Sequence, residues 1–470
     1  MSDVLLRELG GIVGLHHVLT GEAARPYLTD WRKLVHGRAR LVVRPGNTAE
    51  VAAVMCACSA QGVPVVPQGG NTGQVAGGVP GPEGGAVLLS LARLNRVRAI
   101  DTENDTMTVE AGCVLQAVQQ AAEAAGRLFP LSLGAEGSCM IGGNLGSNAG
   151  GTQVLRYGNA RELCLGLEVV LPDGEVWHGL RGLRKDNSGY DLRDLFIGSE
   201  GTLGIITAAT LKLFPLPVAR CTALAALASI HEAGRFLARC RAGFHATLTG
   251  FELMSGACLQ LVTQAYPHQR APFPALAAPW YVLLEISDAE DKAHGLARLE
   301  AVLGAALEAG EIADVAMAQN IAQTRAMWQL RESITLALAE DGKCIKHDVS
   351  LPVSTIPDFV ERTDAALQRN FPGVRNFVFG HLGDGNLHYN VARPRAADDA
   401  ALHAMQPKLS DLVHDAVHAL GGSISAEQGI GRVRTAELAR YKQPVELRLM
   451  RAIKQAIDPR GLLNPGVLLP

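Results

Sequence analysis

Two histidines that flank a glycine-rich turn could bind a metal ion. His381 and His388 lie in FVFGHLGDGNLHYNV, where two predicted strands are joined by a Gly-Asp-Gly-Asn turn. Such a hairpin brings the two imidazoles together, and the two-residue period of a strand puts Asn390 on the same face as His388. A single histidine in a strand is more often a hydrogen-bonded core residue. Two that converge on one turn favour a metal site.

A carboxylate would complete this site, and Glu427 in the segment SAEQGIG is the candidate. Two imidazoles and one carboxylate bind zinc with a coordination position left open, as catalytic zinc centres do. That position could take a substrate oxygen. We therefore predict that His381, His388 and Glu427 bind a divalent metal.

A helix and the strand after it carry residues that could bind a dicarboxylate. Arg331 and Thr335 are four residues apart in one predicted helix and would share a face, and Lys346 follows on a predicted strand. A guanidinium can hold one carboxylate through two hydrogen bonds, and an ammonium can neutralise a second. The alternative is that Arg331 is an ordinary solvated charge.

Two glycine-rich runs could hold a large cofactor. The first, PVVPQGGNTGQVAGGVP, spans residues 64–80, and the second, LGAEGSCMIGGNLGSNAGGTQVLRYG, spans residues 133–158. Because glycine has no Cβ, its backbone can lie directly against a long polar ligand. A flexible surface loop is the alternative for either run alone. Two such runs favour a large cofactor.

The elements before the first run favour a cofactor with a pyrophosphate. A strand (ARLVVRP) precedes a helix that begins with a cap at Asn47 or Thr48 and carries Glu50 in its first turn, and a second strand then enters the glycine run. This order is expected where backbone N–H groups hold a pyrophosphate. The run lacks G-x-G-x-x-G followed by a helix, so a nicotinamide cofactor is the weaker hypothesis.

The pattern of helices and strands predicts an α+β protein in three parts. Residues 1–217 form a cofactor domain, in which Asp173-Gly174 marks a hairpin. Residues 218–420 alternate helices and strands, which predicts a cap with helices on one face of a sheet. Residues 421–470 form a C-terminal segment.

The composition is that of an ordinary globular protein. Its 470 residues suggest two or three domains. A net charge of −3 and the lack of a basic stripe argue against nucleic acid as a partner. Nine scattered cysteines fit a reducing compartment. Because no signal peptide or transmembrane segment is apparent, we expect a cytoplasmic location.

Four motifs in order resemble the vanillyl-alcohol oxidase superfamily of flavoenzymes. They are PVVPQGGNTG, IGGNLGSNAGG, GSEGTLGIIT and DPRGLLNPG. More narrowly, the chain from about residue 27 onward resembles the D-2-hydroxyglutarate and D-lactate dehydrogenase group. The resemblance implies a two-subdomain PCMH-type FAD-binding domain, an α+β substrate (cap) domain with a large antiparallel sheet, and a C-terminal helical segment that returns to the flavin domain.

The resemblance also implies where FAD binds. The pyrophosphate is expected on Gly69 to Gly73, and the flavin ring near the second run. Members that tether FAD use a histidine in the first loop, where this chain has Asn71 and Thr72, so we expect noncovalent FAD. The residues that the resemblance assigns to FAD are Pro67, Gly69, Gly70, Asn71, Thr72, Gly73, Leu133, Gly134, Ser138, Gly142, Gly143, Asn144, Asn148, Gly150, Gly151, Ile206 and Asn464.

The resemblance implies oxidation of a D-2-hydroxyacid, with D-2-hydroxyglutarate favoured over D-lactate or glycolate. Arg331, Thr335 and Lys346 match residues that bind substrate carboxylates, and the metal positions match a site that holds zinc, or sometimes manganese or iron. Asn390 and the metal are expected to hold the 2-hydroxyl and its carboxylate while Cα gives hydride to flavin N5. The chain has no C-x-x-C-x-x-C cluster motif, so an external acceptor such as an electron-transfer flavoprotein or a quinone is implied. A homodimer is compatible with this group.

One residue departs from the resembled pattern. Where the group has Glu-His-Gly, with the histidine as base, this chain has Gln428, which cannot accept a proton at neutral pH. The metal could lower the pKa of the substrate hydroxyl, oxidation could be slow, or His347 could act as the base, although strand alternation places it opposite Lys346. The alternative from another class is a non-catalytic flavin-binding subunit.

Overall fold

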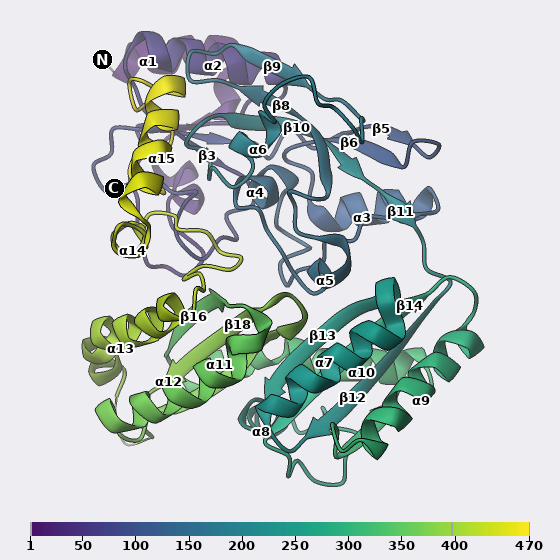
Figure 1. The fold of residues 1–470 in the computed structure, drawn as a ribbon. Helices are drawn as coiled ribbons and strands as arrows, with labels where there is room; N and C mark the ends of the chain where they lie inside the picture. The colour runs from purple at the N-terminus through teal and green to yellow at the C-terminus, as the bar shows by residue number, and fades with distance from the viewer. Residues whose placement is uncertain (1, 396–397, 470) are drawn as a thin grey trace. The chain divides into compact units, whose positions relative to one another are not determined.

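The computed structural model describes residues 2–395 and 398–469, and the chain forms two compact units (Figure 1). The first unit consists of Met1–Gly150, Tyr157–Leu216 and Glu427–Pro470. The second unit consists of Gly151–Arg156 and Pro217–Ala426. The domain borders expected after residues 217 and 420 lie near the unit borders, whereas the short piece from 151 to 156 was not anticipated.

Two larger sheets and a two-stranded ribbon organise the first unit. The four-stranded sheet has the order β1-β2-β4-β3, and the five-stranded antiparallel sheet has the order β5-β6-β10-β8-β9. The ribbon pairs β7 with β11. The strands are β1 (Val18–Leu19), β2 (Leu41–Val43), β3 (Val65–Gln68), β4 (Val87–Ser90), β5 (Val97–Asp101), β6 (Thr106–Glu110), β7 (Arg127–Leu128), β8 (Cys164–Val170), β9 (Val176–Gly179), β10 (Ile205–Lys212) and β11 (Phe214–Pro215).

Local sequence signals explain several elements of this unit. The Asn47 side chain accepts a hydrogen bond of 2.9 Å from the Glu50 N–H and caps α2, as the sequence predicts. The Asp173-Gly174 turn joins β8 to β9, and Gly174 has the positive φ of 92° that favours glycine. The helices are α1 (Ser2–Val13), α2 (Thr48–Ala60), α3 (Leu115–Ala124), α4 (Ile141–Gly146), α6 (Arg193–Phe196), α14 (Thr435–Tyr441) and α15 (Pro444–Ile457). Helix α5 (Val154–Tyr157) spans the border, and all but its last residue belong to the second unit.

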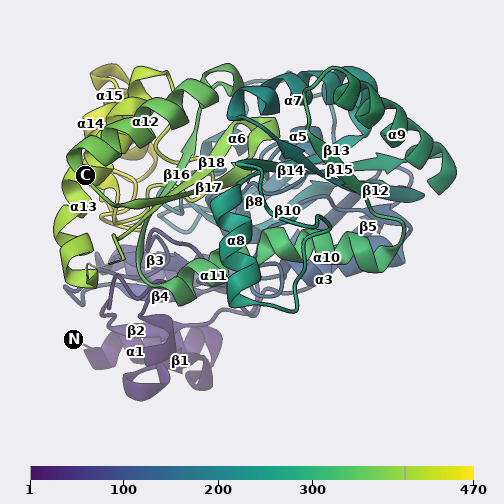
Figure 2. The same cartoon turned by 90° about the horizontal axis from the view of Figure 1, so that it is seen from below.

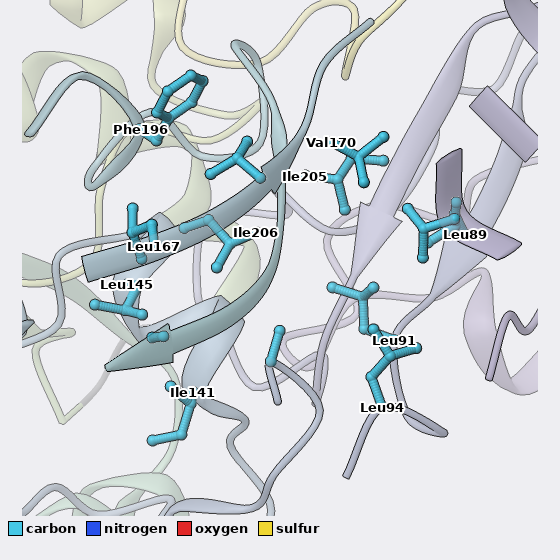
Figure 3. Packing of buried hydrophobic residues seen from close by; sticks show 14 of the residues in the cluster. Leu89, Leu91, Leu94, Ile141, Leu145, Leu167, Val170, Phe196, Ile205 and Ile206 are labelled. Carbon is cyan, nitrogen blue, oxygen red and sulfur yellow. The ribbon is translucent and has the colours of Figure 1, made fainter. Parts of the chain in front are cut away.

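Helix α4 anchors the second glycine run to the core. Its Ile141 and Leu145 side chains point into the same buried cluster as Leu167 of β8 and Ile206 of β10 (Figure 3). Each of these four side chains is at most 6% exposed. The run is therefore attached to the core of the unit, because buried apolar residues alternate with its glycines along the chain.

The second unit is built on one antiparallel sheet of seven strands. Its order is β15-β12-β14-β13-β17-β18-β16. This agrees with the large antiparallel sheet that was expected. The strands are β12 (Ala219–Leu227), β13 (Leu248–Ser255), β14 (Trp280–Asp288), β15 (Asp314–Met317), β16 (Cys344–Ser350), β17 (Arg375–His381) and β18 (Asn386–Ala392).

Helices cover both faces of this sheet, so the expectation of helices on one face is wrong (Figure 2). The α13 face carries α7 (Ile230–Phe244), α9 (Lys292–Glu308), α12 (Ile356–Asn370) and α13 (Asp399–Ala419). The α8 face carries α8 (Gly256–Ala265), α10 (Ile321–Glu332) and α11 (Ile334–Asp341). The reason is that the central strands are apolar in both directions: in β14, Val282 and Leu284 face one cluster while Tyr281 and Leu283 face the other.

Across the described ranges 2–395 and 398–469, we find no helix with the length and apolar character that a membrane span requires.

Candidate metal centre and active site

The predicted metal ligands lie together. His381, His388 and Glu427 offer ligand atoms that are all within 4.8 Å of one another, and the centroids of the two imidazole rings are 5.5 Å apart. Glu427 directly follows Ala426, whose N–H donates to the Asp348 carbonyl of β16 at 3.2 Å. A donor set of two imidazoles and one carboxylate at this spacing fits a divalent ion such as zinc.

Two glycines shape the hairpin that carries the histidines. Gly385 has a φ of 87°, and a side chain there would meet the Leu351 carbonyl oxygen at 2.3 Å. Gly380 has a φ of 151°, and a side chain there would meet the Asn386 carbonyl oxygen at 2.6 Å. This close backbone approach brings the end of β17 and the start of β18 together, with one histidine on each.

A buried carboxylate that the sequence analysis missed joins His381 to Arg331. Glu252 of β13 has no exposed surface and lies opposite His381 in the strand register. Its Oε1 accepts a hydrogen bond of 2.6 Å from His381 Nδ1, and its Oε2 accepts one of 2.9 Å from Arg331 Nε and forms an ion pair with Nη2, also at 2.9 Å. The only signal in the sequence was a glutamate within the otherwise apolar strand TLTGFELM.

The two neighbours keep Glu252 ionised. Burial by itself raises the pKa of this carboxyl, but the charges of His381 and Arg331 and their hydrogen bonds outweigh burial and lower its pKa from 4.5 to about 2. Arg331 is 8% exposed, and its guanidinium carbon lies 4.7 Å from the centroid of the Phe379 ring. The alternative that Arg331 is a solvated surface charge is therefore excluded.

The helix predicted to carry both Arg331 and Thr335 is in fact two helices. Helix α10 ends at Glu332 and α11 begins at Ile334. Ser333 lies at the junction, where its hydroxyl bonds to the Gln269 side chain at 3.0 Å. Arg331 is thus in the last turn of α10 and Thr335, which is half-buried, is in the first turn of α11. The substrate role of Thr335 stays a prediction.

Strand pairing separates Lys346 from His347. Lys346 lies opposite Asn390, two residues along β18 from His388, and so belongs to the α8 face. His347 lies opposite Tyr389 on the α13 face. The Tyr389 carbonyl can only accept, so His347 Nδ1 donates to it at 3.0 Å, and Nε2 accepts from the Ser410 hydroxyl at 3.1 Å. This placement argues against His347 as the base.

The two glycine runs touch each other in the first unit. A side chain at Gly70 would come within 2.1 Å of the Ser138 carbonyl oxygen, and one at Gly69 would lie 3.6 Å from the Gly143 nitrogen. Conversely, no described atom lies within 4 Å of the positions that side chains would take at Gly73 and Gly143. The result is a strip of bare backbone that fits a long polar cofactor.

Two of the asparagines assigned to FAD also hold this strip in place. Asn71, at a φ of 53°, donates to the Thr29 carbonyl at 2.8 Å. Asn464, at a φ of 43°, donates to the carbonyls of Gly77 and Glu200 at 2.9 and 2.7 Å. Within the described residues, the buried Oδ1 of Asn464 has no hydrogen-bond partner, so a hydroxyl of the cofactor could donate to it.

A second carboxylate that the sequence analysis missed holds the segment after Glu427. The Glu200 side chain accepts from the N–H groups of Ile430 and Gly431 at 2.8 and 2.7 Å. Burial raises the pKa of Glu200, although these two bonds partly offset that effect. The motifs GSEGTLG and EQGIG are therefore joined within the first unit.

Two family matches define the class of this protein. Residues 39–179 match the family described as "FAD binding domain", and residues 216–468 match "FAD linked oxidases, C-terminal domain". The solved structure of p-cresol methylhydroxylase with substrate bound has the same fold, with a TM-score of 0.77 at 16% identity over 99% of this chain and 96% of that one. The protein is an FAD-dependent oxidoreductase of the PCMH-type fold.

Full-length relatives define the family more narrowly. The mitochondrial D-2-hydroxyglutarate dehydrogenase of Bos taurus is 40% identical over 471 residues, which cover 100% of this chain and 84% of the relative. The D-2-hydroxyglutarate dehydrogenase of Xanthomonas citri pv. viticola is 41% identical over 442 residues, which cover 94% and 92% of the two chains. The chain belongs to the D-2-hydroxyglutarate dehydrogenase family, as its motifs predicted.

The predicted cytoplasmic location is wrong by this comparison. The names of the relatives from Bos taurus, Rattus norvegicus and Arabidopsis thaliana place those proteins in mitochondria. The prediction relied on composition and on the amino-terminal residues, neither of which reports the compartment in which a folded enzyme works.

Proposed function

We propose that this protein oxidises D-2-hydroxyglutarate to 2-oxoglutarate. The observation that carries the proposal is the buried Arg331, which shares Glu252 with the metal-site residue His381. A guanidinium held beside a metal site suits a substrate with two carboxylates, one for each centre. The bound FAD supplies the acceptor for the hydride from the substrate Cα.

The strip of glycine backbone would hold FAD without a covalent bond. The first glycine run contains Asn71 and Thr72 where tethering members of the resembled superfamily have a histidine. Backbone N–H groups of the run and the Asn464 Oδ1 would bind the cofactor's polar atoms. Acid precipitation should therefore release all of the yellow chromophore into the supernatant.

His381, His388 and Glu427 would hold the divalent ion, which we propose is zinc. A bound zinc ion supplies a Lewis acid that lowers the pKa of the substrate hydroxyl. Asn390, on the same face of β18 as His388, would bind the neighbouring carboxylate. Metal analysis of purified protein, followed by reconstitution with zinc, manganese or iron(II), tests the identity of the ion.

Arg331, Thr335 and Lys346 would bind the distal carboxylate. Nε of Arg331 donates to Glu252 and Nη2 pairs with the same oxygen, so the remaining N–H groups of the guanidinium would bind the ligand. The ammonium of Lys346 would come from β16, on the same face of the sheet. This arrangement predicts weaker binding of D-lactate, which lacks the distal carboxylate.

Gln428 occupies the position of the base in the resembled group, so we propose that a water molecule takes the hydroxyl proton. The Gln428 amide would orient this water because it can donate and accept but cannot be protonated at neutral pH. A positioned base contributes about 10²-fold or more to such a step. Gln428→His should therefore raise kcat, and an unchanged or lower kcat would contradict this role.

An anaerobic titration tests the function directly. Purified protein is mixed with D-2-hydroxyglutarate, D-malate, D-lactate or L-2-hydroxyglutarate, and flavin absorbance is followed. We expect the fastest bleaching with D-2-hydroxyglutarate and none with the L enantiomer. Faster bleaching with D-lactate would favour a D-lactate dehydrogenase, and no bleaching with any hydroxyacid would favour a non-catalytic flavoprotein. The reduced protein can then be mixed with an electron-transfer flavoprotein or a quinone to identify its acceptor.

A further inference from the structure

We propose that Glu252 is a positioning residue that sets the geometry of the metal ligand His381 and of the substrate-binding Arg331 together. The inference rests on the proposed function, because it takes these two residues as binding groups. One carboxylate serves both: Oε1 bonds to the imidazole and Oε2 bonds to the guanidinium. The Glu252 side chain thereby connects the proposed metal ligand to the residue that would bind the distal carboxylate of the substrate.

The contact with Glu252 selects the tautomer of His381. Oε2 of Glu252 accepts from Arg331 Nε, and Oε1 lies 2.6 Å from His381 Nδ1, so the carboxylate acts as an acceptor on both sides and the imidazole carries a proton on Nδ1. In that tautomer the lone pair is on Nε2, which is the form that a metal ion requires. Metal-binding histidines commonly donate their other ring N–H to a carboxylate, which fixes the ring and makes it a stronger ligand.

The same carboxylate fixes the plane of the Arg331 guanidinium. Nε donates to Oε2 at 2.9 Å and Nη2 lies at an ion-pair distance of 2.9 Å from the same oxygen, while the Phe379 ring lies against the guanidinium. These contacts on one edge and one face leave little rotational freedom in the side chain. A ligand carboxylate therefore meets an arginine whose orientation is already set, which lowers the entropic cost of binding.

The backbone of Glu252 is as constrained as its side chain. Strand β13 lies inside the sheet between β14 and β17, and Glu252 pairs with Leu283 on one side and His381 on the other. A shift of the carboxylate would require a shift of this ladder. The register of these strands thus fixes the position of His381 relative to Glu252, and Arg331 reaches the same carboxylate from α10.

Glu285 on the neighbouring strand β14 provides a matched control. It is also buried, with 5% of its surface exposed, and its carboxylate faces α10 on the same side of the sheet. Its partners, however, are the neutral Thr222 hydroxyl at 3.1 Å and the Trp328 indole N–H at 2.9 Å. Replacing Glu285 changes a buried carboxylate without touching either binding group.

The first test compares the affinity of Glu252→Gln and Glu285→Gln for Zn²⁺ alone. Metal-free protein that retains FAD is titrated with Zn²⁺ in competition with a chromophoric chelator. We expect a dissociation constant about 10- to 100-fold higher for Glu252→Gln, and a change of less than about twofold for Glu285→Gln. Equal affinity in Glu252→Gln and the wild type would overturn the inference.

The second test uses the substrate. At a Zn²⁺ concentration that saturates the variant, loss of the Arg331 orientation should raise the KM of Glu252→Gln for D-2-hydroxyglutarate by about 10-fold, while the KM for D-lactate changes much less. A general loss of structure would instead affect both substrates alike, and equal changes in both KM values would count against the inference. Glu285→Gln should show neither change.

A third measurement needs no variant and covers the case in which Glu252→Gln does not fold. The ¹⁵N NMR spectrum of histidine-labelled, metal-free wild type should show a proton on His381 Nδ1, and a ring protonated on Nε2 alone would refute the inference. The outcomes also separate the two proposals. If the wild type neither binds Zn²⁺ nor oxidises a hydroxyacid, the proposed function fails, whereas an active wild type with an equally competent Glu252→Gln overturns only the role of Glu252.

Discussion

The seven-stranded sheet carries buried histidines on both faces, and their partners differ. On the α8 face, His381 bonds to Glu252 at 2.6 Å and His388 lies 3.5 Å from Asp348. On the α13 face, His347 bonds to a backbone carbonyl and to the Ser410 hydroxyl. Carboxylates lie beside both histidines of the proposed metal site, whereas these two bonds of His347 go to uncharged oxygen atoms.

Packing differs in the same way. The ring of His347 lies 5.3 Å from that of His414 in an edge-on contact and 6.5 Å from that of Tyr389, which has no exposed surface. The ligand atoms of His381, His388 and Glu427 instead lie within 4.8 Å of one another. A carboxylate partner makes an imidazole a better ligand, while neutral partners satisfy a core histidine. One face is therefore suited to chemistry and the other to stability.

The largest expected effect comes from removing a metal ligand. His388→Ala should abolish stoichiometric Zn²⁺ binding and lower kcat with D-2-hydroxyglutarate by about 10³-fold, because a Lewis acid contributes several kcal/mol to such a reaction. Metal analysis and steady-state kinetics measure the two effects, with His347→Ala as the control from the α13 face. If the His388→Ala enzyme bound no zinc and still turned over at the wild-type rate, the α8 face would not be the one that supports catalysis.

A smaller effect is expected from Arg331→Lys. Lysine keeps the charge beside Glu252 but loses the planar fork that holds a carboxylate. We expect KM for D-2-hydroxyglutarate to rise about 10-fold, since one charge-assisted hydrogen bond is worth about 1.5 kcal/mol or more. The KM for D-lactate should change little, and a parallel rise for both substrates would show that Arg331 does not recognise the distal carboxylate.

His347→Ala should affect stability and leave catalysis intact. The substitution removes partners of the Tyr389 carbonyl and the Ser410 hydroxyl, so the free energy of unfolding should fall by about 2 kcal/mol. Denaturant unfolding measures this change, and kcat with D-2-hydroxyglutarate should stay within about twofold of the wild type. A large loss of kcat in a folded, metal-replete variant would restore His347 as a candidate base.

The smallest expected effect is a pH dependence of stability that arises from Asp364, a residue of α12 on the α13 face. Burial raises the pKa of the Asp364 carboxyl above 3.8, partly offset by hydrogen bonds from Tyr389 and Asn376. Because the folded protein then holds this proton more tightly than the unfolded chain, the contribution of Asp364 to stability is fully present below pH 3.8 and is lost as the pH rises through the raised pKa.

Asp364→Asn, which remains neutral, tests this sign. Its free energy of unfolding should fall less than that of the wild type as the pH rises from about 4 to 7. Urea denaturation at several pH values measures the two slopes. Parallel profiles would show that Asp364 does not titrate differently in the folded and unfolded states.

The sequence by itself determined the parts of the molecule that follow short-range rules. The Asn47 cap and the Asp173-Gly174 turn depend on residues within a few positions of each other, and both were predicted. The proximity of His381 and His388, the proposed metal ligands, also followed from such rules, because one glycine turn joins their strands. The FAD-binding motifs were recognisable since their glycines must occur at fixed spacing to bring backbone to a ligand.

Only the tertiary structure showed which distant residues support the site. Glu252 meets His381 because β13 lies beside β17 in the sheet. It meets Arg331, which is far away in the chain, because α10 packs on the same face of that sheet. The break at Ser333 and the covering of both faces likewise depend on packing between elements. A sequence specifies which face of a strand each residue occupies, but what lies against that face is decided by elements far away in the chain.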